Sequence, residues 1–278
     1  MPDRRCLLQP ALTWELKGEA MRTSILVVVC LVSMTRLASA QTPEPPSQPA
    51  ADTGTVHETA VPFRSIFTGL GHDVRHLPSP ANGLILGVAG FSALAIHPRD
   101  EVLTRRASNS EPIDETFDAG AVLGNGVTQF GLAFGTYVVG RATGHANVAL
   151  TGSDLVRGQI VNALLTQGVK FSVQRRRPNG GRYSFPSGHT SAAFVTAAVV
   201  QRHYGWRLGV PAYGLASYVA MSRLSENRHF ASDVLVGAAI GMVSGRAVTV
   251  GRGRAQFDLA PIGVRGGGGV GFTLRQTP

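Results

Sequence analysis

The sequence predicts an all-α fold, a bundle of about six helices with a possible short C-terminal β-hairpin. Apolar residues make up 44% of the 278 residues and charged residues only 15%, so a large part of the chain is buried or faces lipid. Apolar segments recur along the chain and are rich in alanine and glycine, small residues that let helices approach one another closely. The C-terminal residues differ, because apolar and other residues alternate on both sides of a run of glycines.

The beginning of the chain has the composition of a leader. Residues 21–40 contain an early arginine, an apolar run and the small residues Ala38, Ser39 and Ala40, which is typical of a secretory signal peptide. A first membrane anchor is the alternative. Residues 1–20 are polar, and we expect that they form a leader extension or are not translated. The sequence therefore predicts an exported protein.

After the leader, we expect a linker and a mature chain without cysteine. Both cysteines, Cys6 and Cys30, precede residue 41, so the mature chain would have no disulfide, thiol nucleophile or cysteine metal site. Residues 41–62 are rich in proline and polar residues and are predicted to be a disordered linker.

The predicted helical domain covers residues 63–250. It begins with a short amphipathic piece at 63–77, which Pro78 and Pro80 end. The segments expected to form the bundle are 81–96, 119–140, 155–173, 190–203, 208–222 and 231–249. Several are too short to distinguish a core helix from a membrane span, so both alternatives stay open.

The last segment, residues 251–278, is predicted to be a tail or a β-hairpin. Residues 257–264 and 270–275 flank the glycines at 266–269, as two strands flank a turn. A flexible tail is the alternative.

A first motif in the helical domain places two cations on one helical face. Lys170 and Arg177 are seven residues apart, about two helical turns, and Pro178 ends that helix. Lys170 is the only lysine after Lys17, which indicates that a compact point charge is required there. The alternative is an exposed basic patch at residues 175–177.

A second motif, Pro-Ser-Gly-His at residues 186–189, lies directly before an apolar helical segment. Free backbone N–H groups and the helix dipole make such a position suitable for a phosphate, and Gly188 allows close approach of the backbone. The alternative is that Ser187 is a simple helix cap.

A third motif contains Arg223, His229 and Asp233. The histidine and the aspartate are four residues apart, so a helix would place the carboxylate one turn from the imidazole. An aspartate that accepts a hydrogen bond from one ring nitrogen fixes the tautomer and makes the other nitrogen more nucleophilic. A histidine satisfied at a helix start is the alternative. Together, the three motifs suit phosphoryl transfer without a metal ion.

In this order, the motifs resemble those of the type 2 phosphatidic acid phosphatase family, whose fold is shared with vanadium haloperoxidases and bacterial acid phosphatases. The resemblance covers about residues 117–250. It departs in the segment between Pro178 and Pro186, which is shorter than the family's usual loop and bears on the substrate entrance more than on the chemistry.

The resemblance implies a role for each motif residue. His229 would attack phosphorus and form a phosphohistidine, and Asp233 would orient it. His189 would protonate the leaving group and then activate water. The phosphate oxygens would be bound by Lys170, Arg177, Ser187, Gly188 and Arg223. The remaining histidines are expected to be structural or solvated: His57, His72, His76, His97, His145 and His203.

The expected function is therefore a metal-independent phosphatase for phosphomonoesters or pyrophosphates. The apolar helices favour a lipid phosphate such as phosphatidic acid or a polyprenyl pyrophosphate, and a membrane as partner. No cofactor is expected, although vanadate would bind as a phosphate mimic. The site would lie in the periplasmic space or face it from the inner membrane. The alternatives are a soluble periplasmic nonspecific acid phosphatase, a vanadate-dependent haloperoxidase and a non-catalytic binding protein. Scattered arginines argue against a nucleic-acid partner.

Overall fold

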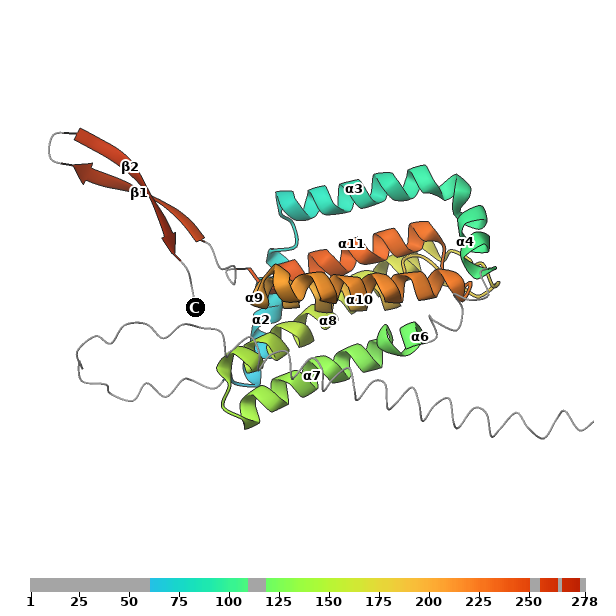
Figure 1. Cartoon of the computed structure of the whole chain (residues 1–278), viewed down its shortest axis with the longest axis horizontal. Helices are drawn as coiled ribbons and strands as arrows, with labels where there is room; N and C mark the ends of the chain where they lie inside the picture. The colour runs from blue at the N-terminus through green and yellow to red at the C-terminus, as the bar shows by residue number, and fades with distance from the viewer. Residues whose placement is uncertain (1–60, 110–118, 251–255, 265–266, 276–278) are drawn as a thin grey trace, which may run out of the picture.

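The computed structural model describes residues 61–109, 119–250, 256–264 and 267–275, and it confirms the all-α fold. A short helix, α2 (Arg64–Arg75), lies across one end of a bundle of longer helices (Figure 1). The helices of the bundle are α3 (Pro80–Ile96), α4 (Asp100–Ser108), α6 (Ala119–Leu123), α7 (Gly126–Ala142), α8 (Ala146–Val173), α9 (Gly188–Tyr204), α10 (Trp206–Ser225) and α11 (Ala231–Val248). The 3₁₀ turn η2 (His97–Arg99) joins α3 to α4 at the end of the bundle opposite α2.

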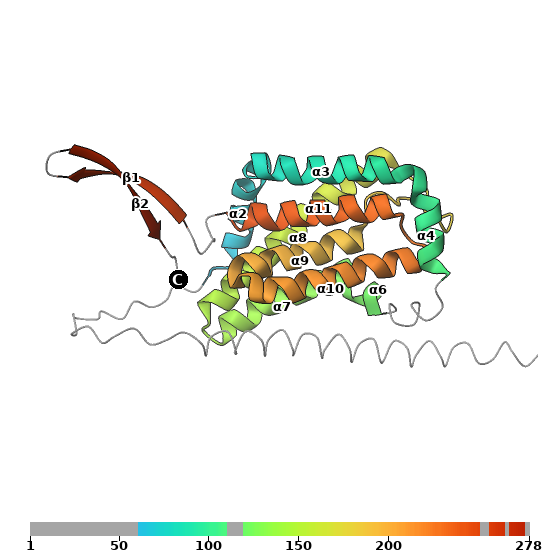
Figure 2. The same cartoon turned by 45° about the horizontal axis from the view of Figure 1, so that its top comes forward.

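Helix α9 occupies the middle of the bundle, where it contacts α8, α10 and α11. Helix α3 lies against α11 from outside, and α7 packs against α8 (Figure 2). The six predicted apolar segments are helical, although one of them is divided into two helices, and the amphipathic piece at 63–77 forms α2.

Helix boundaries differ from the prediction in three places. Lys170 and Arg177 were expected on one helix ended by Pro178, but α8 ends at Val173, where Gln174 has a positive φ of 50°, so Arg177 lies in the loop that follows.

The segment at 119–140 is divided into α6 and α7, because Asn125 accepts a hydrogen bond from the Val127 amide (2.8 Å) and starts a new helix. Helix α8 begins at Ala146 rather than at residue 155. The added turns contain Asp154, a charged residue that is buried beside Arg157 and is therefore compatible with the bundle interior.

Glycines permit the close crossings of the bundle. A Cβ atom on Gly152 of α8 would lie 2.1 Å from the backbone nitrogen of Tyr137 in α7. A Cβ atom on Gly241 of α11 would lie 2.2 Å from the backbone oxygen of Ser191 in α9. Both contacts are with backbone, which cannot move aside as a flexible side chain could, so these pairs of helices need glycine to approach as they do.

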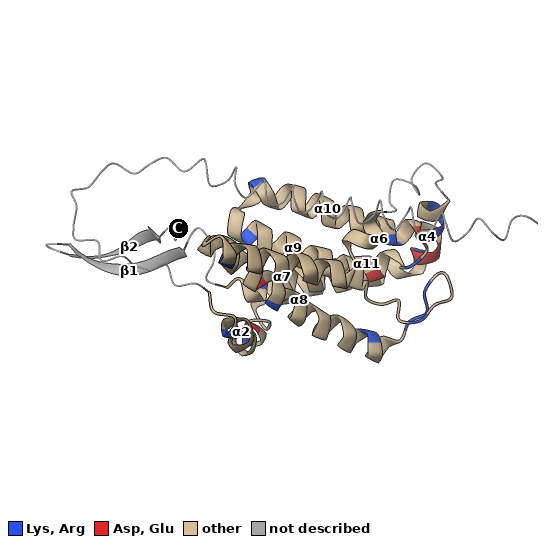
Figure 3. Ribbon diagram, turned by 90° about the horizontal axis from the view of Figure 1, so that it is seen from below, with Lys and Arg blue, Asp and Glu red and all other residues tan. Residues whose placement is uncertain are grey.

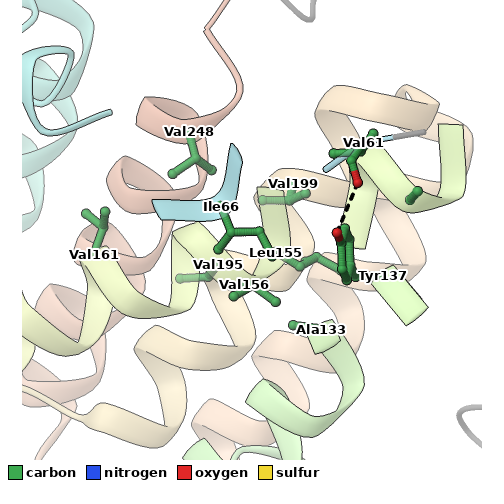
Figure 4. Close-up of a cluster of buried hydrophobic side chains, with 11 residues drawn as sticks. Val61, Ile66, Ala133, Tyr137, Leu155, Val156, Val161, Val195, Val199 and Val248 are labelled. Carbon is green, nitrogen blue, oxygen red and sulfur yellow. Dashed lines mark hydrogen bonds between the residues drawn. The ribbon is translucent and has the colours of Figure 1, made fainter. Parts of the chain in front are cut away.

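The larger hydrophobic cluster joins α2 to the bundle (Figure 4). Ile66 of α2 is 1% exposed and packs with residues of α8 and α9 such as Leu155 and Val195. Tyr137 donates a hydrogen bond from its hydroxyl to the Val61 carbonyl oxygen (3.0 Å). These contacts pack α2 tightly against one end of the bundle. The polar motif residues lie at the other end.

The C-terminal hairpin that the sequence predicted is present. Strand β1 (Gln256–Val264) pairs antiparallel with β2 (Gly267–Arg275), from Gln256 opposite Arg275 to Val264 opposite Gly267. The strands are joined by two residues, and most of the glycines expected in the turn therefore belong to β2. The leader at 1–20 and 21–40 and nearly all of the linker at 41–62 lie outside the described residues.

Candidate active site

The three motifs meet at the α4 end of the bundle. Lys170 lies in the last turn of α8, His189 in the first turn of α9 and Asp233 in the first turn of α11. His229 lies in the short connection between α10 and α11. Helices that run in alternating directions thus bring together side chains that are far apart in the sequence.

His229 and Asp233 form a buried pair. The Nδ1 atom of His229 faces Oδ2 of Asp233 at 3.5 Å, which is longer than an ordinary hydrogen bond, and the side chains are 2% and 0% exposed. The same oxygen accepts hydrogen bonds from the Phe230 amide (2.9 Å) and the Ser184 hydroxyl. Burial lowers the pKa of His229 and the negative charge of Asp233 opposes this effect, so the imidazole is held mainly in its neutral, nucleophilic form.

A pocket of about 360 Å³ opens beside this pair. Its lining includes cations from two different motifs, Arg177 and Arg223, together with both motif histidines. Arg228 and Glu226 also line it, and the carboxylate of Glu226 accepts a hydrogen bond from Nη2 of Arg223. The full lining is Ala121, Val122, Asn125, Thr128, Arg177, His189, Arg223, Glu226, Arg228 and His229. Such a lining suits a small anion.

His189 faces the same pocket, and its surroundings keep it neutral. Burial, followed by the positive charge of Arg223, lowers the pKa of His189 to about 4. A bound phosphate would offset the positive charges and would therefore raise this pKa toward the range needed by a general acid.

Lys170 lies beside the start of α9. Its Nζ atom donates a hydrogen bond to the Tyr183 carbonyl oxygen (2.7 Å), and a Cβ atom on Gly188 would lie 3.8 Å from its Cε atom. Burial, and then the charge of Arg177, lower the pKa of Lys170 to about 8. Arg177 itself is oriented by a hydrogen bond from Nε to the Arg182 carbonyl oxygen (3.1 Å).

Ser187 is fully buried and caps α9. Its hydroxyl oxygen accepts hydrogen bonds from the Thr190 amide (3.4 Å) and the Thr190 hydroxyl (2.9 Å), and its amide donates to the Asp233 carbonyl oxygen (3.0 Å). The helix-cap alternative thus describes its side chain in this structure. The contacts of Ser187 and Gly188 with a phosphate stay predictions.

Some residues at the site were not found from the sequence. Arg175, considered only as part of an exposed basic patch, instead donates a hydrogen bond to Asp233 (2.8 Å) and is only 18% exposed at its side chain. Ser184 and Glu226 were also missed. The arginine run at residues 175–177 does not indicate that Arg175 binds Asp233, because the two residues are 58 apart in the sequence.

Two of the histidines expected to be structural or solvated pair with aspartates. His203 lies with Nε2 at 2.8 Å from Oδ2 of Asp154, and His97 lies with Nδ1 at 3.2 Å from Oδ2 of Asp100. The partner of His97 is three residues away, whereas the partner of His203 belongs to another helix. Neither histidine lines the pocket.

Known proteins share the motif-bearing part of the chain. Residues 164–256 match the family model described as the PAP2 superfamily. The lipid A 1-phosphatase of Porphyromonas gingivalis is 41% identical over 97 residues, which is 34% of this chain and 22% of that protein. The lipid A 4'-phosphatase of Helicobacter pylori is 28% identical over 99 residues, which is 31% of this chain and 50% of that protein. The chain thus spans half or less of the length of these curated relatives.

Two solved structures are also similar. The crystal structure of Aquifex aeolicus LpxE has a TM-score of 0.45 at 24% identity and covers 52% of this chain and 92% of that one. The structure of a transmembrane PAP2-type phosphatidylglycerolphosphate phosphatase from Bacillus subtilis has a TM-score of 0.45 at 21% identity and covers 60% of this chain and 92% of that one. The match to the PAP2 superfamily model is thus limited to residues 164–256, which hold all three motifs.

Proposed function

We propose that the chain is a lipid phosphate phosphatase that works through a phosphohistidine on His229. One observation carries the proposal. His229, backed by Asp233, shares a pocket with two arginines and a second histidine. This set provides a nucleophile, charge stabilisation for a phosphoryl group and a group that can transfer a proton.

In the first step, Nε2 of His229 attacks phosphorus while the bond from phosphorus to the leaving oxygen breaks. Asp233 accepts the hydrogen bond from Nδ1 and so stabilises the positive charge that develops on the ring. His189, protonated when the phosphate is bound, gives its proton to the leaving alkoxide. Arg177, Arg223 and Lys170 stabilise the charge on the other phosphate oxygens.

In the second step, neutral His189 takes a proton from water, whose oxygen attacks phosphorus as the bond to His229 breaks. Inorganic phosphate leaves, and the proton on His189 is available for the next leaving group. One imidazole therefore acts as acid and then as base in the bound complex, and kcat should fall at both low and high pH.

The surface of the bundle supports a substrate that lies in a membrane. Two helical stretches, Pro80–Ser108 and Ala231–Val248, are long and apolar enough to cross one. The second is largely buried in the bundle, which accounts for its apolar character, but the first is only 11% buried. Its side chains Phe91 and Leu94 are each 76% exposed. Lys, Arg, Asp and Glu lie toward the ends of the bundle and leave its middle uncharged (Figure 3), as expected for helices that face lipid.

The curated relatives add a candidate substrate. Both proteins similar to part of this chain are named as lipid A phosphatases. We therefore add a phosphate on a glycolipid such as lipid A to the candidate substrates, beside phosphatidic acid and a polyprenyl pyrophosphate. Export, with the site facing the periplasm, is part of the same proposal.

No metal or other cofactor enters the proposed reaction. The phosphate charge is stabilised by Lys170, Arg177 and Arg223, and these cations would repel a divalent metal ion at the same place. Vanadate, which has the shape and charge of a phosphate, is expected to bind to the pocket as an inhibitor.

The test is phosphate release by the purified chain in EDTA. The substrates are lipid A, phosphatidic acid, a polyprenyl pyrophosphate and p-nitrophenyl phosphate, each assayed also with His229→Ala. We expect turnover of a lipid substrate that the variant lacks. A clear preference for p-nitrophenyl phosphate would favour a soluble acid phosphatase instead. Absence of turnover, with bromination of a phenol dye when vanadate is added, would contradict the proposal in favour of haloperoxidase chemistry.

A further inference from the structure

A buried aspartate outside the three motifs contacts the site from the N-terminal half of the chain. Asp100, the first residue of α4, is 1% exposed and lies outside the residues that match the family model. Its Oδ1 atom accepts a hydrogen bond from the Ser232 amide (3.0 Å). Its Oδ2 atom accepts hydrogen bonds from the Ser232 hydroxyl and from Nη2 of Arg175 (2.9 Å).

Arg175 connects this aspartate to the aspartate of the third motif. Its Nη2 atom donates to Asp100, while its Nη1 atom donates to Oδ1 of Asp233 (2.8 Å) and to the Ser232 hydroxyl (2.7 Å). The guanidinium carbon lies 4.1 Å from the centre of the Phe230 ring. The planar fork of an arginine can bridge two carboxylates in this way, whereas a lysine ammonium cannot.

Because Arg175 binds one carboxylate oxygen of Asp233, the other oxygen can contact the imidazole of His229. Arg175 occupies Oδ1, and Oδ2 is the atom that faces Nδ1 of His229. Because Asp100 shares the charge of Arg175, the guanidinium is held between two carboxylates rather than drawn fully onto Asp233. Removal of the Asp100 charge would let Arg175 turn toward Asp233, compete for its carboxylate and disturb the contact with His229.

We infer that Asp100 and Arg175 are positioning residues for His229, through an Asp100–Arg175–Asp233–His229 chain of contacts. This inference rests on the proposed function and deepens it, because it places part of the catalytic machinery on α4. The two residues hold the carboxylate of Asp233 in the orientation that His229 needs, and neither of them lines the pocket for the phosphate.

The test compares Asp100→Asn with Asp73→Asn. Asp73 is a matched control, because it is also buried and paired with an arginine, Arg157, but it lies on α2 at the opposite end of the bundle. We expect Asp100→Asn to lower kcat roughly 10- to 100-fold, as misplaced reacting groups do, with KM and the inhibition constant of vanadate changed less than about threefold. If Asp73→Asn loses as much thermal stability as Asp100→Asn, it should still have the wild-type kcat.

A second variant and a readout independent of turnover complete the test. Arg175→Lys keeps the charge but not the fork, so we expect the same loss of kcat, and the double variant should lose less than the product of the two single effects. The NMR signal of the Nδ1 proton of His229 should shift in Asp100→Asn and Arg175→Lys but not in Asp73→Asn. If the wild-type chain shows no phosphatase activity, the proposed function fails and this signal still tests the positioning role. Wild-type kcat and an unshifted signal in folded Asp100→Asn or Arg175→Lys would overturn the inference.

Discussion

The Nδ1 atom of His229 faces Oδ2 of Asp233 at 3.5 Å, with both side chains buried. Because a carboxylate at this position favours the proton on Nδ1, the lone pair is left on Nε2, the atom available to attack a phosphate in the pocket. The proposed chemistry depends on this relationship, and the predictions below test it and its surroundings.

Replacement of Asp233 by asparagine should slow the chemical step much more than it weakens binding. The amide of Asp233→Asn lacks the charge that stabilises the developing imidazolium. In a serine protease the corresponding change costs about 10⁴-fold, and we expect a fall in kcat on the order of 10²- to 10⁴-fold here. Steady-state kinetics and vanadate inhibition separate the two effects. A folded variant that keeps more than about a tenth of the wild-type kcat would refute the role given to Asp233.

His189 should titrate at low pH in the empty protein and at higher pH once an anion is bound. Its pKa is lowered to about 4 by burial and by the charge of Arg223. The negative charge of vanadate favours the protonated ring, so the sign of the shift on binding is upward. NMR titration of His189 with and without vanadate measures it. A pKa that stays low with vanadate bound would remove His189 from the role of general acid.

Lys170 should produce a loss of activity at alkaline pH. Its pKa is lowered to about 8 by burial and by Arg177, so its positive charge is lost as the pH rises through that value. Substrate binding then weakens, and kcat/KM of the wild type should decline above pH ~8. In Lys170→Ala, kcat/KM should be low throughout and lack this decline. The same alkaline profile in the wild type and in Lys170→Ala would show that another group titrates.

The crossing of α7 and α8 should tolerate no Cβ atom at Gly152. Because an added methyl group would meet the backbone of Tyr137 at 2.1 Å, Gly152→Ala should destabilise the fold by about 1–3 kcal/mol or more. Gly131→Ala is the control, since a Cβ atom at this exposed position of α7 has no neighbour within 4 Å and alanine favours helix. Thermal unfolding in detergent should give a lower Tm for the first variant and an equal or higher Tm for the second. Equal Tm values would mean that the helices do not cross so closely.

The sequence predicted the helices and the motifs well, for physical reasons that can be named. Apolar segments rich in small residues favour closely packed helices. The end of α8 was predicted less well, because the helix stops at Val173, where Gln174 has a positive φ of 50°, and not at Pro178. His229 and Asp233 are close in the sequence and do meet, although His229 lies before α11, which begins at Ala231, and not on the helix as expected. These features depend on residues close to one another in the sequence.

Contacts between distant segments could not be predicted in this way. Asp100 lies 75 residues before Arg175, and no periodicity relates the two. Asp154 pairs with His203, 49 residues later, and Asp73 pairs with Arg157, 84 residues later, so neither contact follows a local spacing. The sequence left open whether Ser187 binds a phosphate or caps a helix; its hydroxyl caps α9 in this structure, and its contact with a phosphate stays a prediction.

The most direct test of the central claim is detection of a phosphohistidine on His229. His189→Ala should accumulate the intermediate with p-nitrophenyl phosphate, since this leaving group needs little protonation in the first step while the second step lacks its base. Mass spectrometry after an alkaline quench should find acid-labile phosphate on His229 in this variant, and none in His189→Ala combined with His229→Ala. Phosphate on another residue, or wild-type turnover by His229→Ala, would contradict the proposed mechanism.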